Sequence, residues 1–425
     1  MPAISSKQSH VLTVSGLFAL LGSLWASTLT AQTNTSIGTL IDATQPGPGA
    51  CTSADNTGAT DSFAAVSCKL AAFSSAGGIL FFPSGTYLLN SPIVVPPNVS
   101  VRGTGYGSVL KQPSTVTSKF VTLKKSSSLR DIKLTQVQPM WGSGTWTPNV
   151  YDYQVWASDF DITIENVMLL NPYQGVLVES SGYPAQPIGQ VYIHHLEGQP
   201  LKMGIFIDGD ADISRFEDIH FWPFWSYAPG DQNSLKVAEW TQANGFGIAS
   251  LRDDNPYFAN VFTYSYNYGF YFTASTGSVG QVVGPTSRPN ISNYNCDFCN
   301  FGVAVVGTNT EGIQMSNAVL NTINAPIIVT ADYVSATFTN LDVTGTGSSV
   351  VYVQGNYDSI VVGDSTIREW NINGSGYPAF QIVTGKIGSV MTVSNVLYNN
   401  GHGGSLTSGS TIYTSQLNSA TGLFP

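Results

Sequence analysis

A short pattern of apolar residues recurs along this chain and limits its fold more than any other feature. Residues 175–179 and 204–208 each open on glycine, continue with apolar residues and end in a carboxylate. Each segment begins nine residues after a polar residue, Asn166 or His195, that ends a shorter apolar segment. A repeat of this size indicates a solenoid, in which each unit buries its apolar face against the next unit.

The polar residues that end the shorter segments form a series, which we call the ladder residues. Their spacing is 23–24 residues where the repeat is bare and reaches 42 residues where it carries an insertion. Asn and Asp suit this position because they tolerate a left-handed turn and can hydrogen-bond along the stack. We therefore predict an all-β solenoid of about eleven turns. The ladder residues are Gly103, Asp131, Asn166, His195, Asp218, Asn260, Asn293, Asn317, Asn340, Asp364 and Asn395.

The first 31 residues have the pattern of a secretory leader. Lys7 lies in a short polar start, residues 11–25 are mostly apolar, and small residues follow up to Ala31. The apolar run is short for a membrane span, so we expect cleavage after Ala31 and a secreted, extracellular protein without a membrane anchor. An uncleaved anchor is the alternative. Residues 32–425 would then form one solenoid domain.

An amphipathic helix is predicted ahead of the solenoid, over residues 60–74. Thr60 or Asp61 can cap its start, and the apolar residues that follow fall on one face. Such a helix would cover the first open turn, where the core would otherwise meet water. The apolar residues of that face are Phe63, Val66, Leu70 and Phe73.

Net charge limits the classes of ligand that the protein can bind, and the cysteine content indicates disulfides. Without the leader the formal net charge is 15 − 26 = −11, which argues against nucleic acid and, unless a metal intervenes, against a polyanionic glycan. The four cysteines fall into two pairs, Cys51 with Cys68 and Cys296 with Cys299. In an exported chain two disulfides are the simplest interpretation.

A more specific pattern lies between Gly77 and Gly105. It reads Gly77-Gly78-Ile-Leu-Phe-Phe-Pro83-Ser-Gly85-Thr-Tyr87 and, further on, Val99-Ser-Val-Arg-Gly103-Thr-Gly105. In these residues the sequence resembles the pectate-lyase-like superfamily, in its rhamnogalacturonase/epimerase-like branch. The resemblance covers residues 40–115 and implies a single-stranded right-handed parallel β-helix that acts on polysaccharides. It does not select a reaction, because lyases, hydrolases and phage receptor-binding proteins share this start.

Two insertions rich in aromatic residues, 136–154 and 221–244, interrupt the repeat after Asp131 and Asp218. We predict that they wall a cleft about three turns, or roughly 14 Å, long. Aromatic faces in such a cleft would stack on sugar rings, although the same residues can instead pack on one another. The predicted sugar contacts are Trp141, Trp146, Tyr151, Trp222, Trp225, Tyr227 and Trp240.

Carboxylates interrupt the repeat between these insertions. Glu179 and Asp208 each lie thirteen residues after a ladder residue, so they would stack on neighbouring turns roughly 5 Å apart. Two carboxylates this close raise one pKa and can provide an acid and a base or nucleophile. If Gly247 opens the next strand, the charged residues that follow that strand lie beside Glu179 and Asp208 on the adjacent turn. The further candidates are Arg252, Asp253 and Asp254 for catalysis and Asp210 for substrate binding.

These residues allow three functions. The first is a glycoside hydrolase that uses paired carboxylates without a metal or other cofactor, with His220 as a further catalytic candidate. The second is a polysaccharide lyase in which Ca²⁺ binds the acids and Arg252 or Lys236 removes a proton. The third is a non-catalytic solenoid that binds a glycan. A monomer and a homotrimer are both compatible with the sequence.

Overall fold

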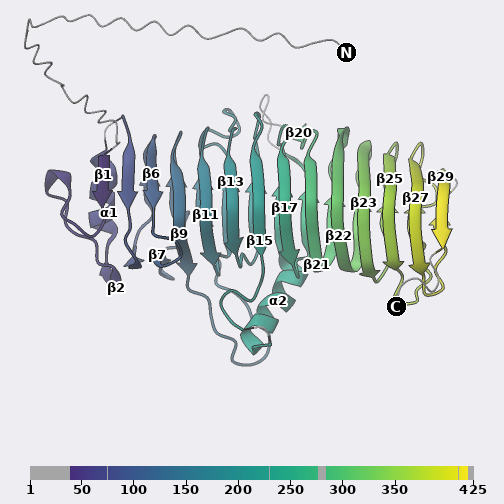
Figure 1. The fold of residues 1–425 in the computed structure, drawn as a ribbon, viewed down its shortest axis with the longest axis horizontal. Coiled ribbons are helices and arrows are strands. Elements are labelled where there is room, and N and C mark those ends of the chain that lie inside the picture. Colours follow the sequence, from purple (N-terminus) through teal and green to yellow (C-terminus); the bar gives the residue numbers. More distant parts are fainter. Residues whose placement is uncertain (1–38, 74, 229, 276–283, 410, 420–425) are drawn as a thin grey trace, which may run out of the picture. The chain divides into compact units, whose positions relative to one another are not determined.

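The chain forms a stack of parallel strands, turn upon turn (Figure 1), and is the right-handed parallel β-helix expected from the sequence. The predicted leader, residues 1–31, lies outside the part of the chain that the structure describes. No helix in the described part is long and apolar enough to cross a membrane. This computed structural model describes residues 39–73, 75–228, 230–275, 284–409 and 411–419.

Each turn contributes three strand segments, which stack into three columns that we call A, B and C. In most turns one long strand supplies columns A and B and bends between them at its ladder residue. The strands of columns A and B are β1 (Thr39–Asp42), β2 (Thr57–Asp61), β3 (Gly78–Phe81), β4 (Gly85–Leu88), β6 (Val99–Arg102), β7 (Ser108–Gln112), β9 (Ser128–Gln136), β11 (Thr163–Leu170), β13 (Tyr192–Gly198), β15 (Arg215–Phe221), β17 (Tyr257–Tyr264), β21 (Asn290–Val305), β22 (Asn309–Val329), β23 (Val334–Thr346), β25 (Ser359–Glu369), β27 (Val390–Asn400) and β29 (Ile412–Ser419).

Column C consists mainly of separate short strands, completed by the ends of β21 and β22. Among the described residues, a short antiparallel pair, two α-helices and one 3₁₀ turn lie outside the columns. The strands of column C are β5 (Ile93–Val95), β8 (Val121–Leu123), β10 (Tyr153–Ala157), β12 (Gln174–Val178), β14 (Met203–Ile207), β16 (Phe246–Ser250), β18 (Tyr268–Phe272), β24 (Val351–Val353), β26 (Phe380–Ile382) and β28 (Thr407–Ser408). The remaining elements are η1 (Pro48–Ala50), α1 (Phe63–Ala71), α2 (Gln232–Asn244), β19 (Ala274–Ser275) and β20 (Gly284–Pro285).

The ladder residues make the bend between columns A and B. All of them except Gly103 have a left-handed backbone, with φ between 51° and 58°. Their side chains also bond from turn to turn: the Asn293 amide donates to Asn260 Oδ1 at 2.9 Å, and that of Asn340 to Asn317 Oδ1 at 2.6 Å. The stack also continues with β1 and β3 before the first ladder residue and with β29 after the last one. The solenoid therefore has more turns than the eleven predicted.

Asn317 offers a test of the ladder. Its amide donates to Asn293 and its carbonyl accepts from Asn340, at a φ of 58°. We expect Asn317→Ala to lower the free energy of unfolding by about 2 kcal/mol, because it loses both bonds and strains the left-handed turn. Asn317→Gly loses only the bonds and should cost about 1 kcal/mol. Denaturant titration measures both, and equal losses would contradict the strain argument.

A glycine lies near the start of five consecutive column C segments, at residues 175, 204, 247, 269 and 302, and faces a filled interior. A Cβ on Gly204 would lie 2.2 Å from the carbonyl oxygen of Gly247 and 2.4 Å from the ring of Phe221. A Cβ on Gly175 would lie 2.4 Å from the carbonyl oxygen of Gly204. Contacts this short are possible only without a side chain, so the repeated glycine reflects the tight corner between columns B and C.

The predicted capping helix is present but shorter than residues 60–74. It spans Phe63–Ala71 because residues up to Asp61 belong to β2, which pairs with β4. The Asp61 carboxylate accepts the Phe63 N–H at 3.0 Å, as a cap does, whereas Thr60 takes no such part. The disulfide predicted between Cys51 and Cys68 holds the helix to the preceding segment.

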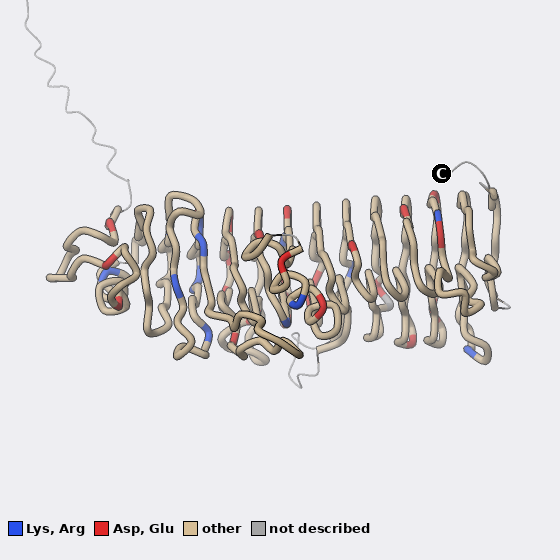
Figure 2. The backbone as a smooth tube through the Cα atoms, turned by 90° about the horizontal axis from the view of Figure 1, so that it is seen from below, with Lys and Arg blue, Asp and Glu red and all other residues tan. Residues whose placement is uncertain are grey.

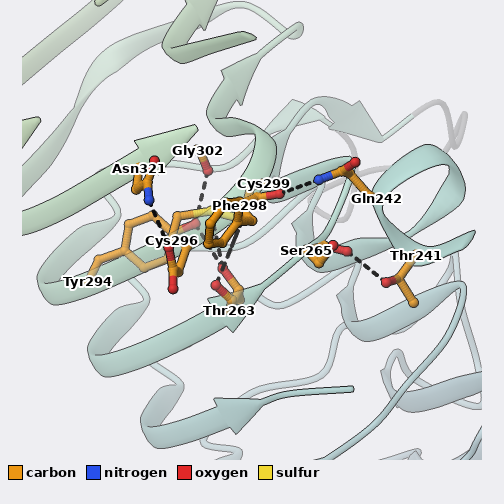
Figure 3. The surroundings of a disulfide bond; sticks show 11 residues. Thr241, Gln242, Thr263, Ser265, Tyr294, Cys296, Phe298, Cys299, Gly302 and Asn321 are labelled. Carbon is orange, nitrogen blue, oxygen red and sulfur yellow. Dashed lines mark hydrogen bonds between the residues drawn. A yellow bond between two sulfur atoms is a disulfide. The ribbon is translucent and has the colours of Figure 1, made fainter. Parts of the chain in front are cut away.

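The second predicted disulfide, Cys296–Cys299, spans a bulge in β21. Figure 3 shows how this bulge meets α2: Gln242 donates to the Phe298 carbonyl at 2.7 Å. On the same side of the helix, Thr241 Oγ1 donates to the Ser265 carbonyl at 2.7 Å. The disulfide region therefore anchors α2 to the β-helix.

The second insertion is largely helical, because α2 occupies more than half of residues 221–244. Asp231 caps this helix by accepting the Asn233 N–H at 2.8 Å. The first insertion packs on it: the Trp141 N–H donates to Asn233 Oδ1 at 2.7 Å, and Trp146 meets Trp240 edge to face, with ring centres 6.3 Å apart. The two insertions therefore form one structural unit.

Candidate functional site

Glu179 and Asp208 come together at the end of column C. Glu179 follows β12, Asp208 follows β14, and the residues before them, Val178 and Ile207, are paired in the sheet. The next strand, β16, pairs Ser250 with Ile207, so the segment with Arg252 follows on the adjacent turn. The register thus places the two carboxylates on neighbouring turns, at a backbone separation of about 4.8 Å.

The insertions do not flank these carboxylates. Both leave the β-helix before column C begins, after β9 and β15, whereas the carboxylates follow the end of column C. In Figure 1 α2 lies below the strands and β20 above them. A five-residue strand, about 16 Å long, separates the two corners. The insertions instead line a hollow of about 300 Å³ with Trp146, Lys236 and Trp240. The predicted cleft therefore does not contain the carboxylates, because residue spacing gives the turn on which an insertion lies but not its corner.

The outer face of column C connects the two corners and carries aromatic side chains that the sequence reasoning missed. Trp156, Phe206 and Tyr271 occupy equivalent positions on alternate turns, and the intervening turns hold Leu177 and Ala249. A second row of rings lies at the start of some of these strands and includes Phe246 and Tyr268, whose ring centres are 5.2 Å apart. Each lies among apolar residues of a strand, where sequence alone does not distinguish an exposed side chain from a buried one.

Glu179 lies at the end of this aromatic face, half-buried. The indole N–H of Trp156 donates to its backbone carbonyl at 2.7 Å. Burial raises the pKa of the Glu179 carboxyl, and the nearby charge of Asp208 raises it further. Lys119 opposes both effects and is itself paired with Asp152 at 3.0 Å. Glu179 can therefore keep a proton at a pH where an exposed glutamate has lost it.

Asp208 is more buried, with 5% of its surface exposed. Ser275 Oγ donates to its Oδ2 at 3.2 Å, and the Arg252 N–H donates to its Oδ1 at 3.3 Å. Tyr183 lies beside them, with its hydroxyl 2.6 Å from Ser275 Oγ. Burial raises the pKa of Asp208, but these hydrogen-bond donors favour its charged form and limit the rise.

Two further acids lie behind this pair, inside the protein. Asp210 and Asp253 have no exposed surface, and each has an oxygen without a hydrogen-bond partner among the described residues. Burial raises the pKa of Asp210 to about 7 and that of Asp253 well above its usual range. The structure therefore gives neither residue the contact with substrate that the sequence suggested.

Arg252 and Asp254 face a separate hollow of about 350 Å³. The Arg252 guanidinium lies 3.9 Å from Asp254 and donates to the Asp210 carbonyl at 3.4 Å. Arg288 and Glu311 form an ion pair at 2.8 Å in the same hollow. Arg252 thus approaches Asp208 through its backbone and directs its side chain towards other partners.

His220 lies apart from the carboxylates, on β15. Its ring packs against Trp222, Trp225 and Phe262, with ring centres 5.0–5.9 Å apart, and burial lowers its pKa. It therefore belongs to an aromatic cluster on the outer side of column B. The structure does not bring it to Glu179.

The aromatic residues of the insertions pack largely on one another, which is the alternative that the sequence left open. Trp146 and Tyr151 are buried, and the Tyr151 hydroxyl donates to the Val137 carbonyl at 2.6 Å. Both have little exposed surface, although Trp146 contributes to the hollow between the insertions. The remaining predicted contacts, Trp141, Trp222, Trp225, Tyr227 and Trp240, are partly exposed around α2 and column B.

No group of three or more His, Cys, Asp or Glu side chains in the described residues is arranged to hold a metal ion. The buried acids are instead tied to the chain by hydrogen bonds, as Asp210 is to the Asp212 N–H at 3.1 Å.

Solved structures share this architecture. The A-module of mannuronan C-5 epimerase AlgE6 from Azotobacter vinelandii matches with a TM-score of 0.56 and 15% identity, over 86% of this chain and 97% of the module. The catalytic unit of a GH87 α-1,3-glucanase from Streptomyces thermodiastaticus matches with a TM-score of 0.52 and 15% identity, over 88% of this chain and 70% of the catalytic unit. The fold that these structures share with this chain is the parallel β-helix. The parallel β-helix implied by residues 77–105 is thereby confirmed.

Solved structures with this fold include proteins other than the epimerase and the glucanase. The N-terminal fragment of bacteriophage phi29 gene product 12 matches with a TM-score of 0.54 and 13% identity, over 89% of this chain and 70% of the fragment. No protein-family model and no curated protein matches this β-helix. At these identities the likeness extends to the fold alone, so the function has to be argued from the site.

Proposed function

We propose that this protein is a carbohydrate-active enzyme that hydrolyses glycosidic bonds in a polysaccharide, and that Glu179 and Asp208 are its catalytic pair. The observation that carries the proposal is their place on neighbouring turns at the end of an aromatic face. Paired carboxylates are the usual equipment of glycoside hydrolysis, and aromatic faces bind sugar rings. The named activities of the epimerase and glucanase neighbours are compatible with a polysaccharide substrate.

We assign the general acid to Glu179 and the base or nucleophile to Asp208. The negative charge of Asp208 is among the causes that raise the pKa of Glu179, which keeps a proton there. Hydrogen bonds from Ser275 and the Arg252 N–H favour the ionised form of Asp208. When their environments push the pKa values of two neighbouring carboxyl groups apart, the group with the higher pKa can act as the acid and the other as the base.

We also propose that the enzyme is secreted and acts outside the cell. The two disulfides are compatible with an oxidising compartment, and the predicted leader provides a route to it.

A second candidate reaction removes a proton from C-5 of a uronate, as in a lyase or an epimerase. The AlgE6 module is named a mannuronan C-5 epimerase, and mannuronan is a uronate polymer. In this protein Lys119 lies close enough to Glu179 to oppose the rise of its pKa, so a cation is present beside one of the two acids. A uronate carboxylate would find a partner there.

Product analysis on a panel of neutral and uronate polysaccharides separates these reactions. Hydrolysis releases reducing ends without ultraviolet absorbance from unsaturated sugars, which is the expected result. Elimination produces that absorbance together with the reducing ends. Epimerisation changes neither signal but alters the C-5 configuration seen by NMR. Either of the last two results would overturn the hydrolase assignment.

A further inference from the structure

A second hollow lies on the outer face of column C, away from the carboxylates. Its volume is about 410 Å³. Phe301, Ile328 and Tyr352 enter it from column C, and Tyr377 enters from the segment that precedes β26. Tyr377 exposes 41% of its surface, so the hollow is open to a ligand.

The chemistry of this hollow fits an uncharged sugar. Every residue that lines it is uncharged. Asn324 and Asn373 supply side-chain amides, for which no hydrogen-bond partner is found within the described part of the chain. A pyranose ring has an apolar face that packs on an aromatic ring and a rim of hydroxyls that pairs with amides.

Charge around the hollow supports the same class of ligand. Of the sixteen Lys and Arg residues, only Arg368 and Lys386 lie beyond residue 300, and neither lines the hollow. Figure 2 shows most blue segments in the N-terminal turns. A uronate polymer would need cations here, because an unpaired carboxylate is costly to desolvate.

The hollow and the catalytic pair lie on the same column of strands, the hollow near the strand starts and the pair at the strand ends. The strand pairings lead from β14 through β16, β18, β21 and β22 to β24, which is five steps along column C. At about 4.8 Å a step, Tyr352 lies roughly 24 Å from Asp208 along the column. Between them Phe246, Tyr268 and Phe301 form a row of stacked rings, with centres 5.2 Å and 5.3 Å apart.

We propose that this hollow is a distal subsite that binds one unit of a neutral polysaccharide while the same chain is cleaved near Glu179 and Asp208. The inference rests on the proposed function for the cleavage, but its binding part stands on the hollow alone. A distal subsite implies that the preferred substrate is a long neutral polymer, since a short oligosaccharide cannot reach both the hollow and the carboxylates.

Affinity electrophoresis tests the binding part without cleavage. The Glu179→Gln protein is run in native gels that contain galactomannan, xyloglucan, pullulan or alginate. We expect at least one neutral polymer to retard it, and Tyr352→Ala with Tyr377→Ala to weaken that binding about tenfold, as loss of buried aromatic area does. Tyr413→Ala is the matched control, because this tyrosine is 61% exposed on β29, outside the hollow.

Three results would overturn the subsite. They are no retardation by any neutral polymer, equal retardation of the double variant and its control, and stronger binding of alginate through the same residues. Asn373→Ala, which changes an exposed side chain, repeats the test in case the double variant does not fold.

A kinetic arm in the active protein links the subsite to cleavage. The double variant should raise KM for the polymer about tenfold and leave kcat/KM unchanged for oligosaccharides too short to span roughly 24 Å. Equal losses on both substrates would contradict the distal location. If no polymer is cleaved, the proposed function fails, whereas the gels still decide whether the hollow binds sugar.

Discussion

The Glu179→Gln variant is expected to hydrolyse the polysaccharide about 10³-fold more slowly than the wild type, because an amide cannot donate the proton that the leaving oxygen needs. Asp208→Asn should lose about as much, since it removes the carboxylate that activates water or attacks the sugar. Initial rates of reducing-end release measure both. The wild-type rate should fall as the pH rises through the raised pKa of Glu179, and Glu179→Gln should lose this dependence.

Two comparisons distinguish an acid catalyst from a structural residue. An aryl glycoside with an activated leaving group needs little protonation, so Glu179→Gln should keep much of the wild-type rate on it. Glu239→Gln is the matched control, because this exposed glutamate pairs with Lys236 on α2, far from column C's carboxylate end. An equal loss on both substrates, or a loss in Glu239→Gln, would contradict the assignment.

The stability of the protein is expected to fall as the pH rises, by roughly 4 kcal/mol between about pH 4 and pH 8. In the folded protein the buried Asp210 keeps its proton up to a pKa of about 7, whereas an unfolded aspartate releases it near pH 4. Unfolding at neutral pH therefore releases a proton and is favoured by higher pH. Asp210→Asn should flatten the dependence, since an amide stays neutral at every pH.

Denaturant titrations at several pH values measure this effect. Asp161→Asn is the control, because Asp161 is exposed and has a φ of 60° that asparagine also tolerates. It should keep the wild-type slope of stability against pH. Asp253 also has a raised pKa, so part of the slope should survive in Asp210→Asn. A slope that is the same in both variants would rule out Asp210 as its origin.

Local pattern was sufficient to predict an all-β solenoid, and the resemblance of residues 40–115 to a known superfamily implied that it is a parallel β-helix. The ladder residues recur because each turn has to bend at the same point, and their left-handed backbone is a property of single residues such as Asn293 and Asn340. Pairing of Cys296 with Cys299 also follows from residues close in the chain. The start of α1 was misplaced by three residues, because the pairing of β2 with β4 overrides the capping signal of Thr60.

The candidate site depended on contacts that no local pattern contains. Spacing placed Glu179 and Asp208 on neighbouring turns, since a fixed period carries equivalent positions into one column. The sequence alone therefore determined the solenoid, its period and this pair. Only the tertiary structure decided which corner carries each insertion, that Trp156 is partly exposed whereas Trp146 is buried, and that Asp210 is buried. Those outcomes depend on how side chains from distant turns pack together and exclude water, which the order of residues within one turn does not determine.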